Sequence, residues 1–335
     1  MKYFDIRELE IRGLKHIDND ANEYYRLPLN MIDKVNENVT FLAKETAGAR
    51  IRFKTNSKNL HIKYQVNEVE GSLLMSGIAN SFIGVYIDNN YSGLMAEDCI
   101  SNKEYLEYKS SYFLDGQYHD VTIYLPIHSQ LLSLCVGIDE DSEIINAKPY
   151  KYEEPVVFYG SSITQGLASS HAGASYVDKL CREVDCDYLN LGFSGSCKGE
   201  TSIGEYIASL DMSAFVLDYD HNAPTIEHLR KTHEAFYRLV RDLHPGMPII
   251  LLSKPNFYYF REKDLIRREI IKQTYLNAKK RNENTYFIDG ETYFGKQGRY
   301  ECTVDGLHPN ELGMEKMAHT IAPVLIKALE EDCYE

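Results

Sequence analysis

The sequence contains no tryptophan and no apolar run near the roughly 20 residues that a membrane span requires. The residues that follow Met1 lack the apolar core of a secretory signal. Basic residues are outnumbered by acidic ones, 36 against 50, so the formal net charge is -14. A chain of this charge repels a phosphate backbone and an anionic lipid surface. These absences predict a cytoplasmic protein that binds neither nucleic acid nor a membrane.

Cysteines and cofactor motifs are also sparse. No CxxC pair occurs, and the scattered positions of the seven cysteines favour reduced thiols: Cys99, Cys135, Cys181, Cys186, Cys197, Cys302 and Cys333. The sequence lacks HExxH, GxGxxG and the Gly-Lys-Ser/Thr ending of a phosphate loop, so we expect neither a metal nor another cofactor. The composition, 44% hydrophobic and 26% charged over 335 residues, is typical of a soluble globular chain of one or two domains.

Apolar and polar residues alternate in the first half of the chain. The alternating runs cover residues 49–54, 60–66, 121–125 and 132–138, and a short apolar run covers residues 85–87. A period of two places one side of each strand in a core. Turn residues such as Asp88-Asn89-Asn90 and Asp115-Gly116 separate the runs, and no helical pattern intervenes. The pattern predicts an antiparallel β-sandwich or jelly roll over residues 1–150.

After Pro155, short apolar runs alternate with helical segments. The runs cover residues 156–159, 188–191, 215–218, 249–253 and 286–289. Residues 225–243 have the spacing of an amphipathic helix, and the histidines of this region, His228, His233 and His244, are expected to face solvent. Five strands in βα alternation predict an α/β domain over residues 151–335, with a parallel sheet between two layers of helices.

Four polar motifs lie where chemistry is expected in such a sheet, beyond the carboxyl ends of the strands. Gly160-Ser161-Ser162-Ile163 follows the first strand, and Gly192-Phe193-Ser194-Gly195 follows the second. Asp220-His221-Asn222 follows the third strand, and Asp305-Gly306-Leu307-His308 precedes the last helix. We expect these motifs to meet at one edge of the sheet.

The residue types in these motifs fit acyl transfer through a serine. A serine hydroxyl attacks only when a base takes its proton, and His308, oriented by Asp305 three residues earlier, can take it from Ser162. The backbone N–H groups of Ser162 and Gly195 and the side-chain amide of Asn222 can stabilise the oxyanion. The sequence therefore predicts Ser162, Asp305 and His308 as catalytic residues and Ser162, Gly195 and Asn222 as the oxyanion hole.

In their order along the chain, the four motifs resemble the motif blocks of the SGNH (GDSL-like) hydrolases. The resemblance covers residues 155–335. It implies a flavodoxin-like fold, Ser162 as the nucleophile, Gly195 as an oxyanion donor, and Asp305 and His308 as acid and base.

The chain departs from the blocks of this family at three positions. Ser161 replaces an aspartate of the first block, and Asp220 and Ala223 replace the glycine and aspartate that flank the asparagine of the third. The altered third block bears on the role of Asn222. A β-sandwich ahead of such a domain is similar to bacterial carbohydrate esterases that remove acetyl groups from xylan or mannan. The resemblance therefore implies a cofactor-independent acetyl esterase whose partner is a small acetylated saccharide.

Other interpretations stay open at this point. One is a short-chain lipase or thioesterase of the same superfamily, and another is a non-catalytic glycan-binding protein with an inactive hydrolase domain. The N-terminal domain can bind glycan, cover the active site or join subunits, so a homo-oligomer stays open as well. The sequence does not choose between these roles.

Several residues near the predicted edge have a structural as well as a functional interpretation. His221 either contacts substrate or fills its loop. Asp289, after the fifth strand, more simply caps a turn, although it and residues 254–256, after the fourth strand, could also shape the substrate pocket. Cys197 is interpreted as a buried apolar residue and Ser194 as structural.

Overall fold

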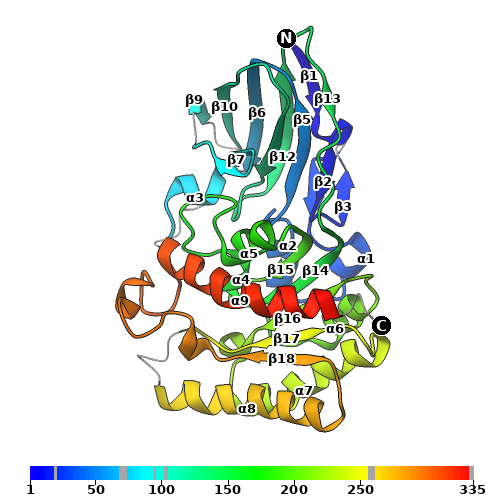
Figure 1. The fold of residues 1–335 in the computed structure, drawn as a ribbon, viewed down its shortest axis with the longest axis vertical. Helices are drawn as coiled ribbons and strands as arrows, with labels where there is room; N and C mark the ends of the chain where they lie inside the picture. The colour runs from blue at the N-terminus through cyan, green and yellow to red at the C-terminus, as the bar shows by residue number, and fades with distance from the viewer. Residues whose placement is uncertain (19–20, 68–73, 94–95, 102–104, 256–260, 332–335) are drawn as a thin grey trace. The chain divides into compact units, whose positions relative to one another are not determined.

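The computed structural model describes all residues except 19–20, 68–73, 94–95, 102–104, 256–260 and 332–335. The chain forms two compact units (Figure 1). The first unit contains Met1–Pro28, Phe41–Tyr150 and Ser170–Gly173, and the second contains Leu29–Thr40, Lys151–Ser169 and Ala174–Glu335. Two short segments, Leu29–Thr40 and Ser170–Gly173, thus lie in the unit opposite to the one that their place in the chain suggests.

Two antiparallel sheets build the first unit. One has the order β1 (Lys2–Asp5), β12 (Leu131–Ile138), β6 (Asn59–Asn67), β10 (Tyr105–Phe113) and β9 (Ala96–Ser101). The other has the order β13 (Ile144–Ile145), β5 (Arg50–Thr55), β11 (His119–Tyr124), β7 (Gly84–Ile87) and β8 (Asn90–Tyr91), with β2 (Glu10–Arg12) also paired to β5. A two-stranded sheet joins β3 (His16–Asp18) to β4 (Glu23–Tyr25), and the short helix α3 (Gly77–Ser81) also belongs to this unit. The helix α1 (Leu29–Ile32) belongs to the second unit, and α2 (Glu37–Ala43) begins there and ends in the first.

The core of the first unit comes from alternate residues of both sheets. Ile51 and Phe53 on β5, and Leu60, Ile62 and Tyr64 on β6, are at most 1% exposed and belong to one hydrophobic cluster. Their neighbours in sequence point the other way, because successive side chains of a strand face opposite sides of the sheet. The predicted antiparallel fold is confirmed.

The second unit has a five-stranded parallel sheet. Its order is β15 (Cys186–Gly192), β14 (Tyr152–Gly160), β16 (Ala214–Asp218), β17 (Ile249–Leu252) and β18 (Thr285–Ile288). This is the 2-1-3-4-5 order of flavodoxin-like folds, and the five predicted strands are confirmed. Residues 156–159 on β14 are completely buried, which explains why this strand has a continuous apolar run and no alternation.

Helices cover both faces of this sheet. The chain passes from β14 to β15 through α5 (Tyr176–Val184), and then back across β14 to β16 through α6 (Thr201–Ala208). Because such crossovers are right-handed, the reversal of direction places α5 and α6 on opposite faces. Helix α9 (Glu311–Glu331) packs against α5, while α7 (Ile226–Leu243) packs against α6 and α8 (Arg261–Lys280). None of the helices within the described ranges is both long and apolar enough to span a bilayer.

The helix predicted at residues 225–243 is present, but one of its histidines does not face solvent as predicted. The predicted helix 225–243 is α7, and Thr225 caps it by accepting the N–H of His228 at 3.0 Å. His233, however, is only 1% exposed, stacks on the ring of Tyr219 and hydrogen-bonds Thr274 at 2.8 Å. The expectation that His233 faces solvent is therefore wrong, because its helical position turns it toward the core beside Leu229 and Phe236.

His228 and His244 are partly buried. Their Nε2 atoms lie 2.7 and 2.9 Å from the carbonyl oxygens of Lys198 and Ala208. Each ring therefore joins its helix to a neighbouring segment, so the expectation of fully solvent-facing rings is only partly met.

Candidate active site

The first motif forms a tight turn between β14 and α4 (Ser162–Gln165), which we call the serine turn (residues 160–165). Ser161 caps α4, since its Oγ accepts the N–H of Ile163 at 3.1 Å. Only glycine fits at position 160, because a Cβ there would lie 2.0 Å from Thr164 Oγ1 and 2.7 Å from the carbonyl oxygen of Asp218. The turn places Ser162 at the carboxyl edge of the sheet, where this residue is only 5% exposed to solvent.

The structure brings Ser162, His308 and Asp305 into one hydrogen-bonded chain. Ser162 Oγ lies 3.1 Å from His308 Nε2, and His308 Nδ1 lies 2.7 Å from Asp305 Oδ2. Because a carboxylate only accepts, Nδ1 carries the proton and Nε2 presents its lone pair to the serine hydroxyl. The arrangement can move a proton from the hydroxyl to the imidazole.

Asp305 is held in its charged form by the backbone of its own loop. Its Oδ1 accepts the N–H groups of His308 at 2.8 Å and of Leu307 at 2.9 Å. Burial opposes the charge, but these N–H groups and the imidazole together lower the pKa of Asp305 below its ordinary value. The loop turns sharply at Gly306, where φ is +86°.

Two backbone hydrogen bonds close the hairpin that contains Asp305 and His308. Val304 donates to the carbonyl oxygen of His308 at 3.0 Å, and Asn310 donates to that of Cys302 at 3.0 Å. Asn310 Oδ1 then accepts the N–H of Gly313 at 3.1 Å, just inside α9. These bonds fix the position of His308 relative to the last helix.

Gly195 and Asn222 lie on the loops that flank the serine turn. In the sheet, Gly160 pairs with Gly192 on one side and with Asp218 on the other, so the three loops start at the same level. This is the switch point of the sheet, where ligands bind in such folds. Gly195 has a φ of +67°, and a Cβ there would meet no atom within 4 Å.

The predicted oxyanion donors have no acceptor within the described part of the protein. Among the described residues, the backbone N–H groups of Ser162 and Gly195 and the amide nitrogen of Asn222 make no hydrogen bond. The second motif is tied to the serine turn, because Ser194 donates its N–H to Gln165 Oε1 at 2.8 Å. Unpartnered donors at this edge are available to a developing negative charge on a substrate oxygen.

A buried cluster behind the serine turn gave no clear signal in the sequence. Ligand-type atoms of Asp218, Asp220 and His221 all lie within 4.8 Å of one another. Asp220 Oδ1 accepts the N–H and Nδ1–H of His221 at 2.7 and 2.8 Å, and its Oδ2 accepts the N–H of Lys254 at 3.1 Å. Among the described residues, these bonds leave Asp218 Oδ1 and His221 Nε2 as the atoms of the cluster without a hydrogen-bond partner.

Most of the residues for which the sequence allows either a structural or a functional role make structural contacts. The His221 side chain is 8% exposed and bonded to Asp220, so it fills its loop. Asp289 caps the short helix η3 (Gly290–Thr292) and pairs with Arg268 at 3.2 Å. Cys197 is fully buried and donates its thiol to the carbonyl oxygen of Gly160.

The segment after the fourth strand is partly described. Lys254 is buried, and its Nζ lies 2.5 Å from Asp264 Oδ2 on α8. Asn256 lies outside the described residues. In the described part of the chain, five cysteines are not in disulfides: Cys135, Cys181, Cys186, Cys197 and Cys302.

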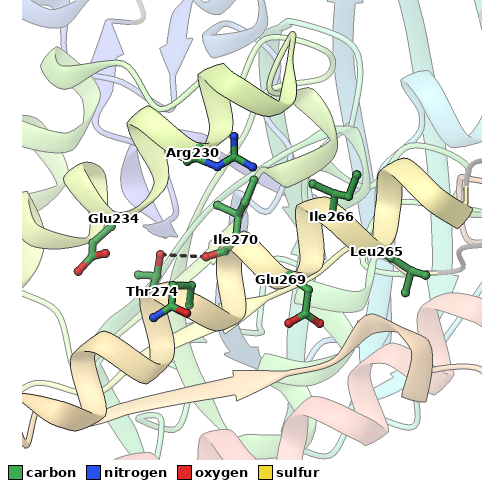
Figure 2. A pocket seen from close by; sticks show the side chains of 8 residues that line it. Arg230, Glu234, Leu265, Ile266, Glu269, Ile270 and Thr274 are labelled. Atoms are coloured by element: carbon green, nitrogen blue, oxygen red, sulfur yellow. Dashed lines mark hydrogen bonds between the residues drawn. The ribbon is translucent and has the colours of Figure 1, made fainter.

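A separate cavity of about 500 Å³ lies between α7 and α8 (Figure 2). Thr274 in its wall donates to the carbonyl oxygen of Ile270 at 3.4 Å, the bond that is dashed in Figure 2. No residue of the serine turn or of the His308 loop lines it. Its lining consists of Arg230, Glu234, Leu265, Ile266, Glu269, Ile270, Gln273 and Thr274.

The fold and this edge define an SGNH-type α/β hydrolase with an antiparallel N-terminal region. Residues 153–326 match the GDSL-like Lipase/Acylhydrolase family, and residues 1–144 match the N-terminus of the SGNH hydrolase-type esterases. The chain belongs to the GDSL-like lipase/acylhydrolase family and is a carboxylic ester hydrolase. Comparison with curated proteins gives no match.

Solved structures resemble the chain over its whole length. A structure from Bacteroides ovatus ATCC 8483, described as a GDSL-like lipase, is 28% identical, with a TM-score of 0.85 over 98% of both chains. The salicylyl-acyltransferase SsfX3 of a tetracycline biosynthetic pathway is 16% identical, with a TM-score of 0.81 over 98% of both chains. An acetyl xylan esterase from the rumen bacterium Butyrivibrio proteoclasticus is 14% identical, with a TM-score of 0.62 over 98% of this chain and 100% of that one. At 16% and 14% identity, the last two likenesses concern the fold.

Proposed function

We propose that the protein removes acetyl groups from oligosaccharides through an acyl-enzyme on Ser162. The observation that carries this proposal is the chain of hydrogen bonds from Ser162 to His308 and from His308 to Asp305, at 3.1 and 2.7 Å. Ser162 Oγ attacks the ester carbonyl carbon while His308 Nε2 takes its proton. The charged Asp305 holds the imidazole in the tautomer that can accept this proton and stabilises the imidazolium that results.

The negative charge that develops on the carbonyl oxygen falls among the donors of the three loops. In the proposal, the N–H groups of Ser162 and Gly195 and the amide of Asn222 bind this oxygen. Each fixed donor of this kind typically contributes about 10²- to 10³-fold to kcat. His308 then gives its proton to the departing sugar hydroxyl, and the same base activates the water that releases acetate.

The substrate class is proposed from the relatives, because a fold does not by itself define a substrate. Support comes from the two-domain likeness to carbohydrate esterases, including the acetyl xylan esterase from Butyrivibrio and a family two carbohydrate esterase from Cellvibrio japonicus. A small acetylated saccharide is therefore the proposed partner.

The experiment compares acetate release from acetylated xylo- and manno-oligosaccharides with hydrolysis of nitrophenyl esters of increasing chain length. Wild-type protein and Ser162→Ala are measured side by side. The proposal expects acetate from the saccharides, a preference for acetyl over longer acyl groups, and no turnover by the variant. Release of fatty acid without acetate would instead support the lipase or thioesterase alternative, and no turnover of any ester would support a non-catalytic glycan-binding role.

A second candidate is acyl transfer to an alcohol in place of water. It is favoured by the TM-score of 0.81 to the salicylyl-acyltransferase, against 0.62 to the acetyl xylan esterase. Both reactions pass through the same acyl-enzyme and differ only in the acceptor. Adding small alcohols to a nitrophenyl ester assay separates them, because an acyltransferase forms the new ester in preference to the free acid.

A further inference from the structure

In the cluster of Asp218, Asp220 and His221, two buried polar atoms have no hydrogen-bond partner within the part of the chain that the structure describes. They are Oδ1 of Asp218 and Nε2 of His221. Asp218 is 1% exposed, and the side chain of His221 is 8% exposed. An unsatisfied polar atom in the interior is costly, and two of them in one cluster need a common explanation.

The bonds already made decide which of these atoms can carry a proton. Asp218 Oδ2 accepts the hydroxyl of Thr164 at 2.9 Å and that of Tyr176 at 3.2 Å, so a proton on this carboxyl resides on Oδ1. His221 Nδ1 faces the carboxylate of Asp220 at 2.8 Å and therefore donates. In the neutral ring, Nε2 is then an acceptor. The two orphan atoms do not bond each other directly, but one water between them satisfies both when it accepts a proton from Asp218 Oδ1 and donates to His221 Nε2.

The charges around Asp218 favour its neutral form. Asp220 is the second carboxylate of the cluster, and its pKa stays low despite burial because His221 and the Lys254 N–H bond it. Two neighbouring buried carboxylates do not both ionise readily. Burial raises the pKa of Asp218 to about 6, and Asp220 adds to the rise while His221, Thr164 and Tyr176 oppose it.

The other charged and titratable groups that face this cluster are already engaged or neutral. Lys254 Nζ pairs with Asp264, and Arg267 donates to the carbonyl oxygens of Asp220 and Ala223. Burial raises the pKa values of Tyr176 and Tyr293 well above the ordinary value, so both hydroxyls stay neutral.

We propose that Asp218 is a positioning residue for the ester hydrolysis and acts as a neutral acid whose Oδ1 donates, through one water, to His221. The proton joins two catalytic loops into one buried network. On one side, Asp218 holds the serine turn through Thr164 and through its carbonyl oxygen, which accepts the N–H of Ser161 at 3.1 Å. On the other side, His221 immediately precedes Asn222. The role in hydrolysis rests on the proposed function, whereas the presence of the proton does not.

The test compares Asp218→Asn with Asp218→Ala between pH 5 and pH 9 on a nitrophenyl ester. The asparagine copies the neutral acid, with an oxygen for Thr164 and Tyr176 and an N–H for the water beside His221, while alanine removes both. We expect alanine to lower kcat by up to about 100-fold with little change in KM, as expected of a misplaced nucleophile. The asparagine variant is expected to retain activity, and its kcat relative to the wild type should rise as the pH passes through about 6.

Three results would overturn the proposal. They are equal damage by both substitutions at every pH, no damage by alanine, or a ratio of asparagine to wild-type kcat that does not change with pH.

A second readout does not need activity. Chemical unfolding should show the wild type losing stability relative to Asp218→Asn as the pH rises from about 4 to above 6, because a folded-state pKa of about 6 favours the protonated form. A difference that stays constant over this range refutes the shared proton even if no ester is turned over. Failure of all ester hydrolysis with this pH-dependent difference intact refutes only the proposed function.

Discussion

The substitution Asp305→Asn tests how the catalytic imidazole is oriented. Asp305 Oδ1 accepts two backbone N–H groups of its loop, from His308 and Leu307, while Oδ2 faces His308 Nδ1. In the variant, the amide oxygen is expected to keep the two backbone bonds, which turns the amide NH₂ toward Nδ1. Nδ1 must then accept, so the ring proton moves to Nε2 and points at the serine hydroxyl. The imidazole can no longer take the proton of Ser162.

The expected loss follows from that tautomer change. A comparable aspartate-to-asparagine change in a serine protease triad lowers kcat by about 10⁴-fold, which corresponds to about 5 kcal/mol of transition-state stabilisation. The side chain of Asp305 is 30% exposed, so water can assist partly, and we expect a loss of about 10³- to 10⁴-fold in kcat at neutral pH.

The assay is steady-state hydrolysis of nitrophenyl acetate, with kcat and KM measured separately. Asp139→Asn is the matched control, since Asp139 also accepts backbone N–H groups, those of Lys58 and Asn59, but lies in the first unit. The control should leave kcat unchanged. If Asp305→Asn retained more than about a tenth of the wild-type kcat while the protein stayed folded, the orienting role of Asp305 would be wrong.

Asn222→Ala should lower kcat by about 10²- to 10³-fold with KM nearly unchanged, and full retention of kcat in a steady-state assay would remove Asn222 from the oxyanion hole. Burial lowers the pKa of His233 to about 4, so the wild type should lose up to about 3 kcal/mol of stability relative to His233→Gln as the pH falls from about 6.5 to 4, measured by chemical unfolding at both ends. An unchanged difference between the two proteins would mean that His233 is solvated. Gly160→Ala should abolish activity and lower the melting temperature, because its Cβ would lie 2.0 Å from Thr164 Oγ1, and a variant of wild-type activity and melting temperature would contradict this tight packing.

Much of the fold could be read from local pattern. The alternation around Ile51 and the continuous run at residues 156–159 differ in period because one strand is buried on one face and the other on both. The pairing of Asp305 with His308 could also be predicted from local sequence. The two residues are three positions apart, and the turn at Gly306 brings both side chains to one side.

The buried cluster could not be found in this way. Asp218 is the last residue of β16 and Asp289 directly follows β18, and nothing in their sequence neighbours distinguishes the two aspartates. What separates them is tertiary: Thr164 and Tyr176, from two other elements, converge on Asp218, whereas Asp289 caps its own turn. His233 was misjudged for a similar reason, because the ring of Tyr219 that covers it comes from a different element.

Reaction with a fluorophosphonate probe, followed by peptide mass spectrometry, tests directly whether His308 activates the hydroxyl of Ser162. Such probes label serine hydroxyls that a neighbouring base has activated. We expect a single label on Ser162, no label in Ser162→Ala, and strongly slowed labelling in His308→Ala. A label on another residue, or an unchanged labelling rate without His308, would contradict this mechanism.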